Sequence, residues 1–428
     1  MKNININVDH LTRVEGHGNI VVNVKQGRIE ECKWEVVEAP RFFEAFVRGR
    51  SYLELSHITS RICGICSVGH TLASLKATEA ALGVQVSEQT RLLRRILAQG
   101  ENLQSHVLHT YFLAAPDFVG APSVFPLVKT HPDVVLRALR LKKLANDLCD
   151  VFGGRTVHPI TPTVNGFTKL PEIEDVKEIR KRLAEARPDL EATLELFKSM
   201  KIPNFKRETE YISLKSKEEY ALYDGAIAST DAGTTPVANY RNWTNEYMVP
   251  HSTAKYTKNV RDSYMVGALA RFNNNHEQLS PGAKKAAAAL ALKAPCYNPF
   301  MNNVAQVVEV VHGVEESIRL IDELVDKGWK EEDRRVVVKA GRGVGSVDVP
   351  RGILFHDYTY DKDGICVEAN CIIPTNQNHS NIQKDMEALL PQIMDRPQDE
   401  IRLSLEMLVR AYDPCISCST HLLKVEFV

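Results

Sequence analysis

Two cysteine pairs with the same spacing stand near opposite ends of this 428-residue chain. Cys63 and Cys66 lie in the run RICGIC, which His70 follows; Cys415 and Cys418 lie in DPCISC, which His421 follows. A two-residue spacer lets both thiolates of a pair converge on one ion, because the backbone between them can form a tight turn. If the pairs share one site, the fold must join segments that 348 residues separate.

Three kinds of site are compatible with these cysteines. A C-x-x-C pair can be redox-active, but no thioredoxin-like βαβ pattern surrounds either pair. Two pairs can bind structural zinc, although zinc ribbons usually separate their pairs by only about 15–20 residues. Soft thiolates also suit nickel and iron in a catalytic or redox centre. The other five of the nine cysteines are scattered, so reduced thiols are expected rather than a disulfide framework.

Composition excludes several classes of protein. With 44% hydrophobic and 25% charged residues, the chain has the make-up of an ordinary globular protein. A formal net charge of −1 gives no reason to expect nucleic acid or an anionic membrane as partner. No apolar stretch approaches the roughly 20 residues of a transmembrane helix. The first ten residues lack the apolar core of a signal peptide, which favours a cytoplasmic location.

Hydrophobic periodicity predicts an α+β fold that is predominantly α, with long central helices and small peripheral sheets. Residues 1–40 alternate like β-strands with a turn at Gln26-Gly27, and residues 335–375 return to β character around an Asp363-Gly364 turn. Helices are expected over residues 71–82, 87–114, 133–152, 172–200 (two, broken near Pro188) and 399–412. We expect a single unit, 1–428, with a helical body at 50–330, a C-terminal helix and metal motif at 397–421, and a tail at 422–428.

Taken together, the motifs resemble those of [NiFe] hydrogenase large subunits. R-x-C-G-x-C-x-x-x-H near the start and D-P-C-x-x-C-x-x-H near the end match that family's signature pair. The resemblance covers nearly the whole chain. Further matching runs are Thr12–His17, Pro40–Glu44, Gly153–Arg155 with His158-Pro159, Ser263–Gly267, Val349–Gly352 and Ile372–Asn376. Several of these resemble the cytoplasmic, bidirectional NAD(P)-linked branch.

The resemblance implies a set of ligands. Cys63 and Cys415 would be terminal nickel ligands, while Cys66 and Cys418 would bridge nickel to an iron that carries carbon monoxide and two cyanides. Four thiolates around one divalent ion leave surplus negative charge, which a second cation spreads. By the same resemblance, Glu44 and His421, with the Cys371 carbonyl, would bind magnesium or iron near the C-terminus.

Other residues are expected to support the reaction, which is reversible heterolytic cleavage of dihydrogen into protons and electrons. Cleavage needs a Lewis acid and a nearby base; a sulfur ligand, Cys418 among them, or Arg351 could be the base. Asp117 resembles the carboxylate partner of Arg351, and Glu15 the proton carrier, expected as a buried carboxylate with a raised pKa. Pro374 and Thr375 would supply hydrogen bonds to a cyanide, and His70 would hydrogen-bond a bridging sulfur.

The number of cysteines indicates that the chain needs a partner subunit. Iron–sulfur clusters need about four cysteines each, and the five spare cysteines form no such group. Electrons must therefore leave through another polypeptide, which the family supplies as an iron–sulfur small subunit. The cytoplasmic branch further implies diaphorase-type flavin (FMN) and iron–sulfur subunits serving NAD(P), ferredoxin or a deazaflavin. Maturation would involve nickel chaperones and a protease that cuts after the final histidine, so a retained tail, 422–428, indicates a precursor or an untrimmed member.

Two other functions remain open from the sequence. A quinone-site subunit like that of respiratory complex I would share the fold, but such chains lack the four cysteines that this one retains. A hydrogen sensor would keep the metal site; sensors typically lack the C-terminal tail.

Overall fold

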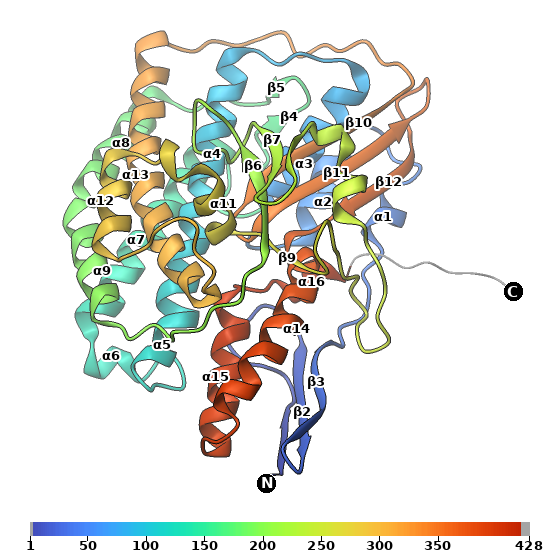
Figure 1. The fold of residues 1–428 in the computed structure, drawn as a ribbon. Helices are drawn as coiled ribbons and strands as arrows, with labels where there is room; N and C mark the ends of the chain where they lie inside the picture. The colour runs from blue at the N-terminus through green and yellow to red at the C-terminus, as the bar shows by residue number, and fades with distance from the viewer. Residues whose placement is uncertain (1–2, 421–428) are drawn as a thin grey trace, which may run out of the picture.

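The computed structural model describes residues 3–420. It begins with an antiparallel sheet of β1 (Ile4–Val8), β2 (Gly18–Lys25) and β3 (Arg28–Val36), in that order. Buried and exposed residues alternate along these strands, and the predicted turn at Gln26-Gly27 has positive φ at both residues. The buried face lies against α14 (Pro374–Ile393) and α15 (Gln398–Ala411), which stand beside the sheet (Figure 1). The N-terminal sheet and the helices α14 and α15 from the C-terminal part of the chain are therefore packed together.

Long helices form the opposite side of the molecule (Figure 1). They are α4 (Glu88–Val107), α7 (Pro132–Gly153), α8 (Ile173–Glu185), α9 (Arg187–Ser199), α12 (Pro281–Ala289) and α13 (Asn302–Lys327). The predicted helices within this group are confirmed to within a few residues, including the break before Pro188, which occupies the first turn of α9. The helix α13 packs on α4 and α12.

The helix predicted to end near residue 114 does not stop there. α4 continues into a π-helical segment, Leu108–Ala114, and then into α5 (Ala115–Phe118), whose first turn holds Pro116. Proline lacks the N–H that an α-helix needs at an interior position, so a wider turn before it lets the chain continue. This segment connects the buried helix α4 to Asp117 in α5.

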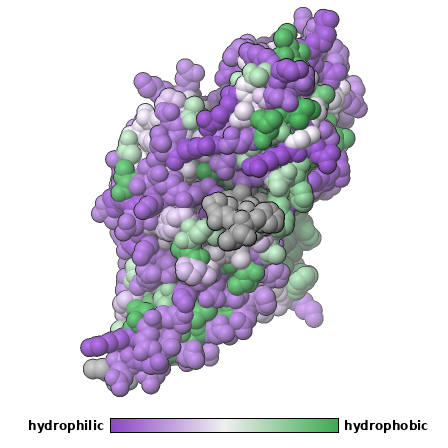
Figure 2. All heavy atoms as spheres, turned by 90° about the vertical axis from the view of Figure 1, so that its right-hand side faces the viewer, coloured by the Kyte–Doolittle hydropathy of each residue, from purple (hydrophilic) through white to green (hydrophobic). Residues whose placement is uncertain are grey.

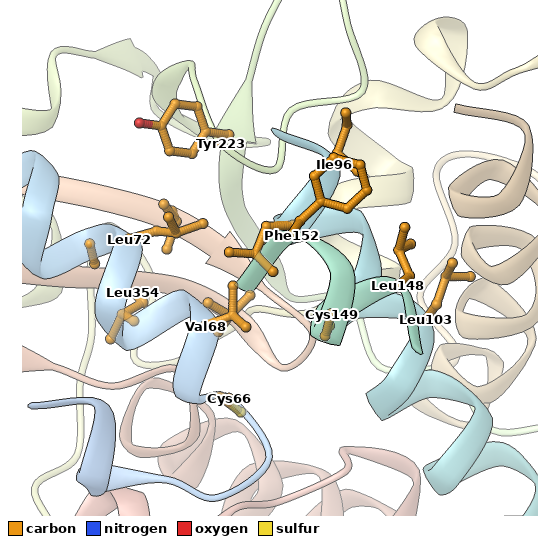
Figure 3. Close-up of a cluster of buried hydrophobic side chains, with 14 of the residues drawn as sticks. Cys66, Val68, Leu72, Ile96, Leu103, Leu148, Cys149, Phe152, Tyr223 and Leu354 are labelled. Carbon is orange, nitrogen blue, oxygen red and sulfur yellow. The ribbon is translucent and has the colours of Figure 1, made fainter. Parts of the chain in front are cut away.

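A second sheet supports the N-terminal cysteine pair. It contains β10 (Gly341–Val349), β11 (Gly352–Tyr360) and β12 (Cys366–Ile372), antiparallel in that order, with the predicted Asp363-Gly364 turn between the last two. The helix α3 (Ser67–Leu82) lies across β10 and β11. A buried apolar cluster from α3, α4, α7 and β11 extends down to Cys66 (Figure 3). Cys149 lies in this cluster and Cys32 in the core beside β1–β3, so both are core residues as expected.

The helical body expected over residues 50–330 also holds strands that periodicity did not reveal. A four-stranded sheet runs β8-β7-β6-β9, and a two-stranded sheet pairs β4 with β5. Their bounds are β4 (Pro162–Thr163), β5 (Gly166–Phe167), β6 (Glu210–Lys215), β7 (Ala226–Ser229), β8 (Gly233–Thr235) and β9 (Tyr264–Met265). The remaining helices are α1 (Phe43–Phe46), α2 (Leu55–Thr59), α6 (Leu127–Thr130), α10 (Arg241–Thr244), α11 (Ala268–Asn275) and α16 (Ile416–Ser419).

The fold is thus α+β and mainly helical, as predicted. Hydrophilic residues dominate the face in Figure 2, where hydrophobic ones form scattered patches. Among the helices that the structure describes, none has both the length and the apolar character needed to span a bilayer.

Candidate metal centre

The N-terminal cysteine pair lies where a short 3₁₀ turn, Ser60–Ile62, gives way to α3. Cys63 is extended and Cys66 directly precedes the helix. The backbone N–H groups of Ile65 and Cys66 donate to the Cys63 sulfur at 3.3 and 3.0 Å. These bonds fold the spacer into the tight turn that the C-x-x-C spacing predicts.

The C-terminal pair is placed by the N-terminus of the chain. After α15 the chain turns at Asp413, whose φ is 51°. Cys415 then forms a parallel β-bridge with Glu15, and the Ile416 N–H donates to the Glu15 carbonyl at 2.8 Å. The Cys415 N–H donates to the Thr375 hydroxyl at 3.0 Å. α16 then carries Cys418 back towards its partner.

The two pairs meet in the interior. The sulfur of Cys63 lies 3.5 Å from that of Cys415, 352 positions later in the chain, and the Cys415 and Cys418 sulfurs are 2.7 Å apart. The sulfurs of these three residues lie within 4.8 Å of one another. Cys66 lines the same small cavity as Cys415 and Cys418. All four cysteines are at most 4% exposed.

The titration of these thiols tests whether the site suits a metal. Contacts with the thiols of Cys415, Cys418 and Cys66 hold the pKa of Cys63 well below its ordinary value. Burial raises the pKa of Cys415 and of Cys418 well above theirs. The protein alone therefore favours one thiolate among neutral thiols, and only a cation would hold all four sulfurs as thiolates. This buried, soft donor set fits nickel and iron, which thiolates prefer to bind.

Arg351 lies at the tip of the β10–β11 hairpin and points into the site. Its Nη1 donates to the Cys66 sulfur at 3.2 Å, and its Nη2 donates to the Asp413 carboxylate at 2.7 Å. Nε donates to the Asp413 carbonyl at 2.7 Å. The carboxylate that pairs with Arg351 is therefore Asp413.

The expectation that Asp117 would pair with Arg351 is corrected. Asp117, at the end of the π-helical extension, accepts instead from Arg13 and from Arg410, the latter at 3.0 Å. The two cations surround it where α5 meets α15 and the N-terminal segment. Asp413 carries the contact because the turn after α15 brings its side chain and its carbonyl to one guanidinium.

Glu15 contacts the C-terminal cysteine motif through its side chain. One carboxylate oxygen lies 3.1 Å from the Cys415 sulfur and also accepts the Ser417 N–H at 3.1 Å. The expected burial is not found: Glu15 is partly exposed in the isolated chain. The sulfur that contacts this carboxylate is that of Cys415.

Further predicted residues surround the cysteines. Thr375 and Pro374 begin α14 and line the cavity with Cys66 and His70. Nδ1 of His70 lies 3.1 Å from Nε2 of His356.

Glu44 is buried, and its carboxylate accepts the Cys371 N–H at 2.7 Å, so two of the three expected ligands of a second cation are adjacent. The third, His421, lies outside the described residues, as does the tail at 422–428.

Three contacts of the site were not predicted from the sequence. Asp413 stands in the D-P-C motif, where it indicates only the end of a helix. Ser105, whose hydroxyl is 3.4 Å from Nη1 of Arg351, gave no signal beyond its place on a predicted helix. His356 lies in a strand, and only the fold brings it to His70.

Comparison with known proteins agrees with this geometry. The family model described as nickel-dependent hydrogenase matches residues 41–133 and 297–421, and a model described as HoxL-like matches 5–39. The alpha chain of sulfhydrogenase 1 from Pyrococcus furiosus is 34% identical over 430 residues, covering 99% of this chain and all of the relative. The chain belongs to the nickel-dependent hydrogenases. More specifically, it is a catalytic large subunit of this oxidoreductase family.

Other relatives extend the comparison. One subunit of the F420-non-reducing hydrogenase of Methanothermobacter marburgensis is 31% identical, over 98% of this chain and 95% of that relative. A crystal structure of an NAD+-reducing [NiFe]-hydrogenase in the H2-reduced state superimposes with a TM-score of 0.85 at 27% identity, covering 97% of this chain and 99% of the other. This hydrogenase chain therefore matches its relatives from end to end.

Proposed function

We propose that this large subunit cleaves dihydrogen heterolytically at a nickel–iron centre held by Cys63, Cys66, Cys415 and Cys418. The convergence of four buried sulfurs from the two ends of the chain carries the proposal. Bound metal would supply the Lewis acid that polarises dihydrogen. Cys63 and Cys415 would be terminal ligands, and Cys66 and Cys418 would bridge to an iron with carbon monoxide and two cyanide ligands.

The residues around the cysteines would serve proton transfer and charge balance. The Cys415 sulfur would take the proton and pass it to the Glu15 carboxylate, 3.1 Å away. Because Glu15 is partly exposed, its proton has a way out of the interior. Arg351, held by Asp413, would place a permanent positive charge beside the sulfur of Cys66 and the anionic ligands of the iron. This geometry favours Cys415 over Cys418 as the base.

The small cavity suits the iron side of the centre. Its lining combines the sulfurs of Cys66 and Cys418 with His70, and with Pro374 and Thr375 at the start of α14. The first backbone N–H groups of a helix have no partner within the helix, so this helix start would donate to a cyanide. Glu44, Cys371 and His421 would hold magnesium or iron and tie the C-terminal segment to α1.

Electrons would pass first to an iron–sulfur small subunit. They would then reach NAD(P) or ferredoxin in the cytoplasm, through diaphorase-type flavin subunits. The likeness to an NAD+-reducing enzyme supports this acceptor. A deazaflavin has less support, because several relatives are named F420-non-reducing. We propose that residues 1–428 form one unit, which nickel chaperones would load and from which a maturation protease would cut the tail at 422–428.

Purification of the native complex tests the proposal. It should contain nickel and iron and should reduce a viologen dye with dihydrogen. Cys418→Ser should abolish hydrogen uptake, whereas Cys149→Ser, at a fully buried cysteine in α7, should leave it intact. Hydrogen uptake that survives Cys418→Ser would refute the ligand role.

A further inference from the structure

Arg271, in α11, is an arginine with no exposed surface that the sequence patterns did not single out. Nε and Nη2 donate to the two oxygens of Glu309 at 2.8 and 2.7 Å, and Nη1 donates to Asp348 at 2.6 Å. Burial alone would raise the pKa of Glu309, but the Arg271 guanidinium and His106 together hold that pKa below its usual value. The charge of Arg271 is therefore matched within the core.

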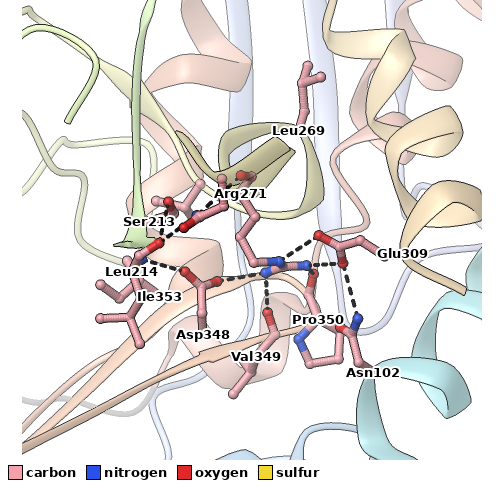
Figure 4. Close-up of polar contacts among 12 residues, drawn as sticks. Asn102, Ser213, Leu214, Leu269, Arg271, Glu309, Asp348, Val349, Pro350 and Ile353 are labelled. Carbon is pink, nitrogen blue, oxygen red and sulfur yellow. Dashed lines mark hydrogen bonds and ion pairs between the residues drawn. The ribbon is translucent and has the colours of Figure 1, made fainter. Parts of the chain in front are cut away.

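The same guanidinium also holds the backbone that leads to Arg351. Nη1 donates to the carbonyl of Val349 at 2.7 Å, and Nη2 donates to that of Pro350 at 2.9 Å (Figure 4). These are the two residues before Arg351, and Pro350 has no N–H with which to fix itself to a neighbouring strand. The position of this turn therefore depends on its carbonyls.

The following residues pack the turn against α11. Gly352 has a φ of +133°, and a Cβ on it would lie 2.4 Å from a methyl carbon of Val266. A Cβ on Gly267 would lie 3.2 Å from the Arg351 carbonyl oxygen. The backbone of Arg351 is thus confined next to the segment from which Arg271 extends. Its side chain is fixed separately by Asp413.

We propose that Arg271 is a positioning residue that fixes the distance between the Arg351 guanidinium and the Cys66 sulfur. The inference rests on the proposed function of Arg351 at the metal centre. Arg271 would act on the reaction through the β10–β11 turn, because its hydrogen bonds go to Glu309, to Asp348 and to the carbonyls of that turn. A shift of about 1 Å in a group that supports catalysis costs on the order of 100-fold in rate, so a loosened turn would be costly.

A second buried arginine supplies the matched control. Arg94 also has no exposed surface, pairs with Glu79 at 2.6 Å and donates to the Thr163 carbonyl at 2.9 Å. Its hydrogen bonds go to Glu79 on α3, to Thr163 on β4 and to the Tyr223 hydroxyl, and none goes to residues 349–352. Arg94→Lys therefore makes the same chemical change at equal burial without touching the turn.

The test introduces Arg271→Lys and Arg94→Lys into the complete complex, each alone and combined with Arg351→Lys. Hydrogen uptake, nickel content and the nickel electron paramagnetic resonance spectrum are measured. We expect Arg271→Lys to lower uptake at least about tenfold with nickel retained and the spectrum shifted. In the Arg351→Lys background the further loss should fall below about twofold, because coupled residues are not additive. Arg94→Lys should leave the spectrum unchanged and cost the same factor in both backgrounds.

Equal losses from Arg271→Lys in both backgrounds, with an unshifted spectrum, would overturn the inference. If Arg271→Lys fails to assemble, Pro350→Gly replaces it as the test, because it loosens the same turn. Its loss of uptake should depend on Arg351 in the same way. Wild-type uptake with an unchanged spectrum in Pro350→Gly would refute the positioning role. Failure of the proposed function looks different. In that case Arg351→Lys alone leaves uptake intact, or the wild-type complex lacks nickel.

Discussion

Glu15 and Cys415 are 400 positions apart in the chain, yet a carboxylate oxygen of the first lies 3.1 Å from the sulfur of the second. Their backbones also pair as a β-bridge. The N-terminal segment therefore delivers an acid–base group to the C-terminal cysteine motif and fixes the backbone of that motif in the same contact.

Glu15→Gln should separate proton transfer from metal binding. Glutamine keeps the size of the side chain and an oxygen for the Ser417 N–H, but it cannot accept and release a proton at neutral pH. We expect hydrogen uptake to fall by about 100-fold or more with nickel unchanged. Glu38→Gln is the control, because Glu38 accepts from the Ser417 hydroxyl at 2.9 Å. Comparable losses of hydrogen uptake in both variants would show that the effect comes from disturbing the backbone around Ser417 and not from removing a proton carrier.

His379 should govern the acid sensitivity of the folded chain. Burial lowers its pKa from 6.5 to about 3. The Trp34 indole donates to Nδ1 at 3.0 Å, so Nε2 carries the proton and donates to the Ser419 hydroxyl at 2.9 Å. Below pH 6.5 this imidazole binds a proton in the unfolded chain but stays neutral in the native chain. Stability from this residue is therefore complete above pH 6.5 and falls as the pH drops towards 3.

The free energy of unfolding, measured with urea at pH 7 and at pH 5, checks this prediction. From pH 7 to pH 5 the free energy of unfolding of the wild type should fall by about 2 kcal/mol because of His379. In His379→Gln that part of the fall should disappear. His57→Gln, at an exposed histidine, should leave the difference between the two pH values unchanged. An identical pH dependence in wild type and His379→Gln would contradict the assignment.

The glycines of β10 should be intolerant of side chains. Gly341, Gly343 and Gly345 share one face of the strand, and a Cβ on Gly345 would lie 2.1 Å from the Ala73 carbonyl oxygen in α3. Because the obstacle is backbone, the helix that begins beside Cys66 would have to move. Gly345→Ala should lower the free energy of unfolding by about 3 kcal/mol, measured by urea unfolding. Gly64→Ala, where a Cβ would meet nothing within 4 Å, should cost far less. Equal losses of unfolding free energy in the two variants would show that α3 can move away from β10 more easily than this spacing indicates.

Periodicity and turn chemistry predicted the N-terminal sheet, the β11–β12 hairpin and the helices α3, α4, α7, α8, α9 and α15, because their apolar residues recur at regular spacing. They did not identify α13 or α14 individually, although α13 lies in the helical body expected over residues 50–330. The β6–β9 sheet could not be found that way. Its strands are two to six residues long, and β6 is buried on both faces, so neither alternation nor length stood out. The packing of α3 on the β10 glycines involves two segments far apart in sequence, and a glycine at every second residue indicates no partner by itself.

Motifs placed the cysteines, Glu15, Arg351 and Thr375 in one region, but they could not assign contacts within it. Asp117 and Asp413 both lie near arginines, and only the fold decides that the first meets Arg13 and Arg410 while the second meets Arg351. Arg271 was missed for a related reason. A charged residue on a helix is normally solvated, and its burial appears only when α11, α13 and β10 come together.

The most direct test is the nickel content per chain after Cys63→Ser alone. Because Cys63 shares one site with Cys415 and Cys418, breaking the N-terminal pair should strip the purified complex of nickel although the C-terminal pair is intact. A Cys63→Ser complex that retains one nickel per chain would contradict the shared site, because the two ends would then not hold a common metal.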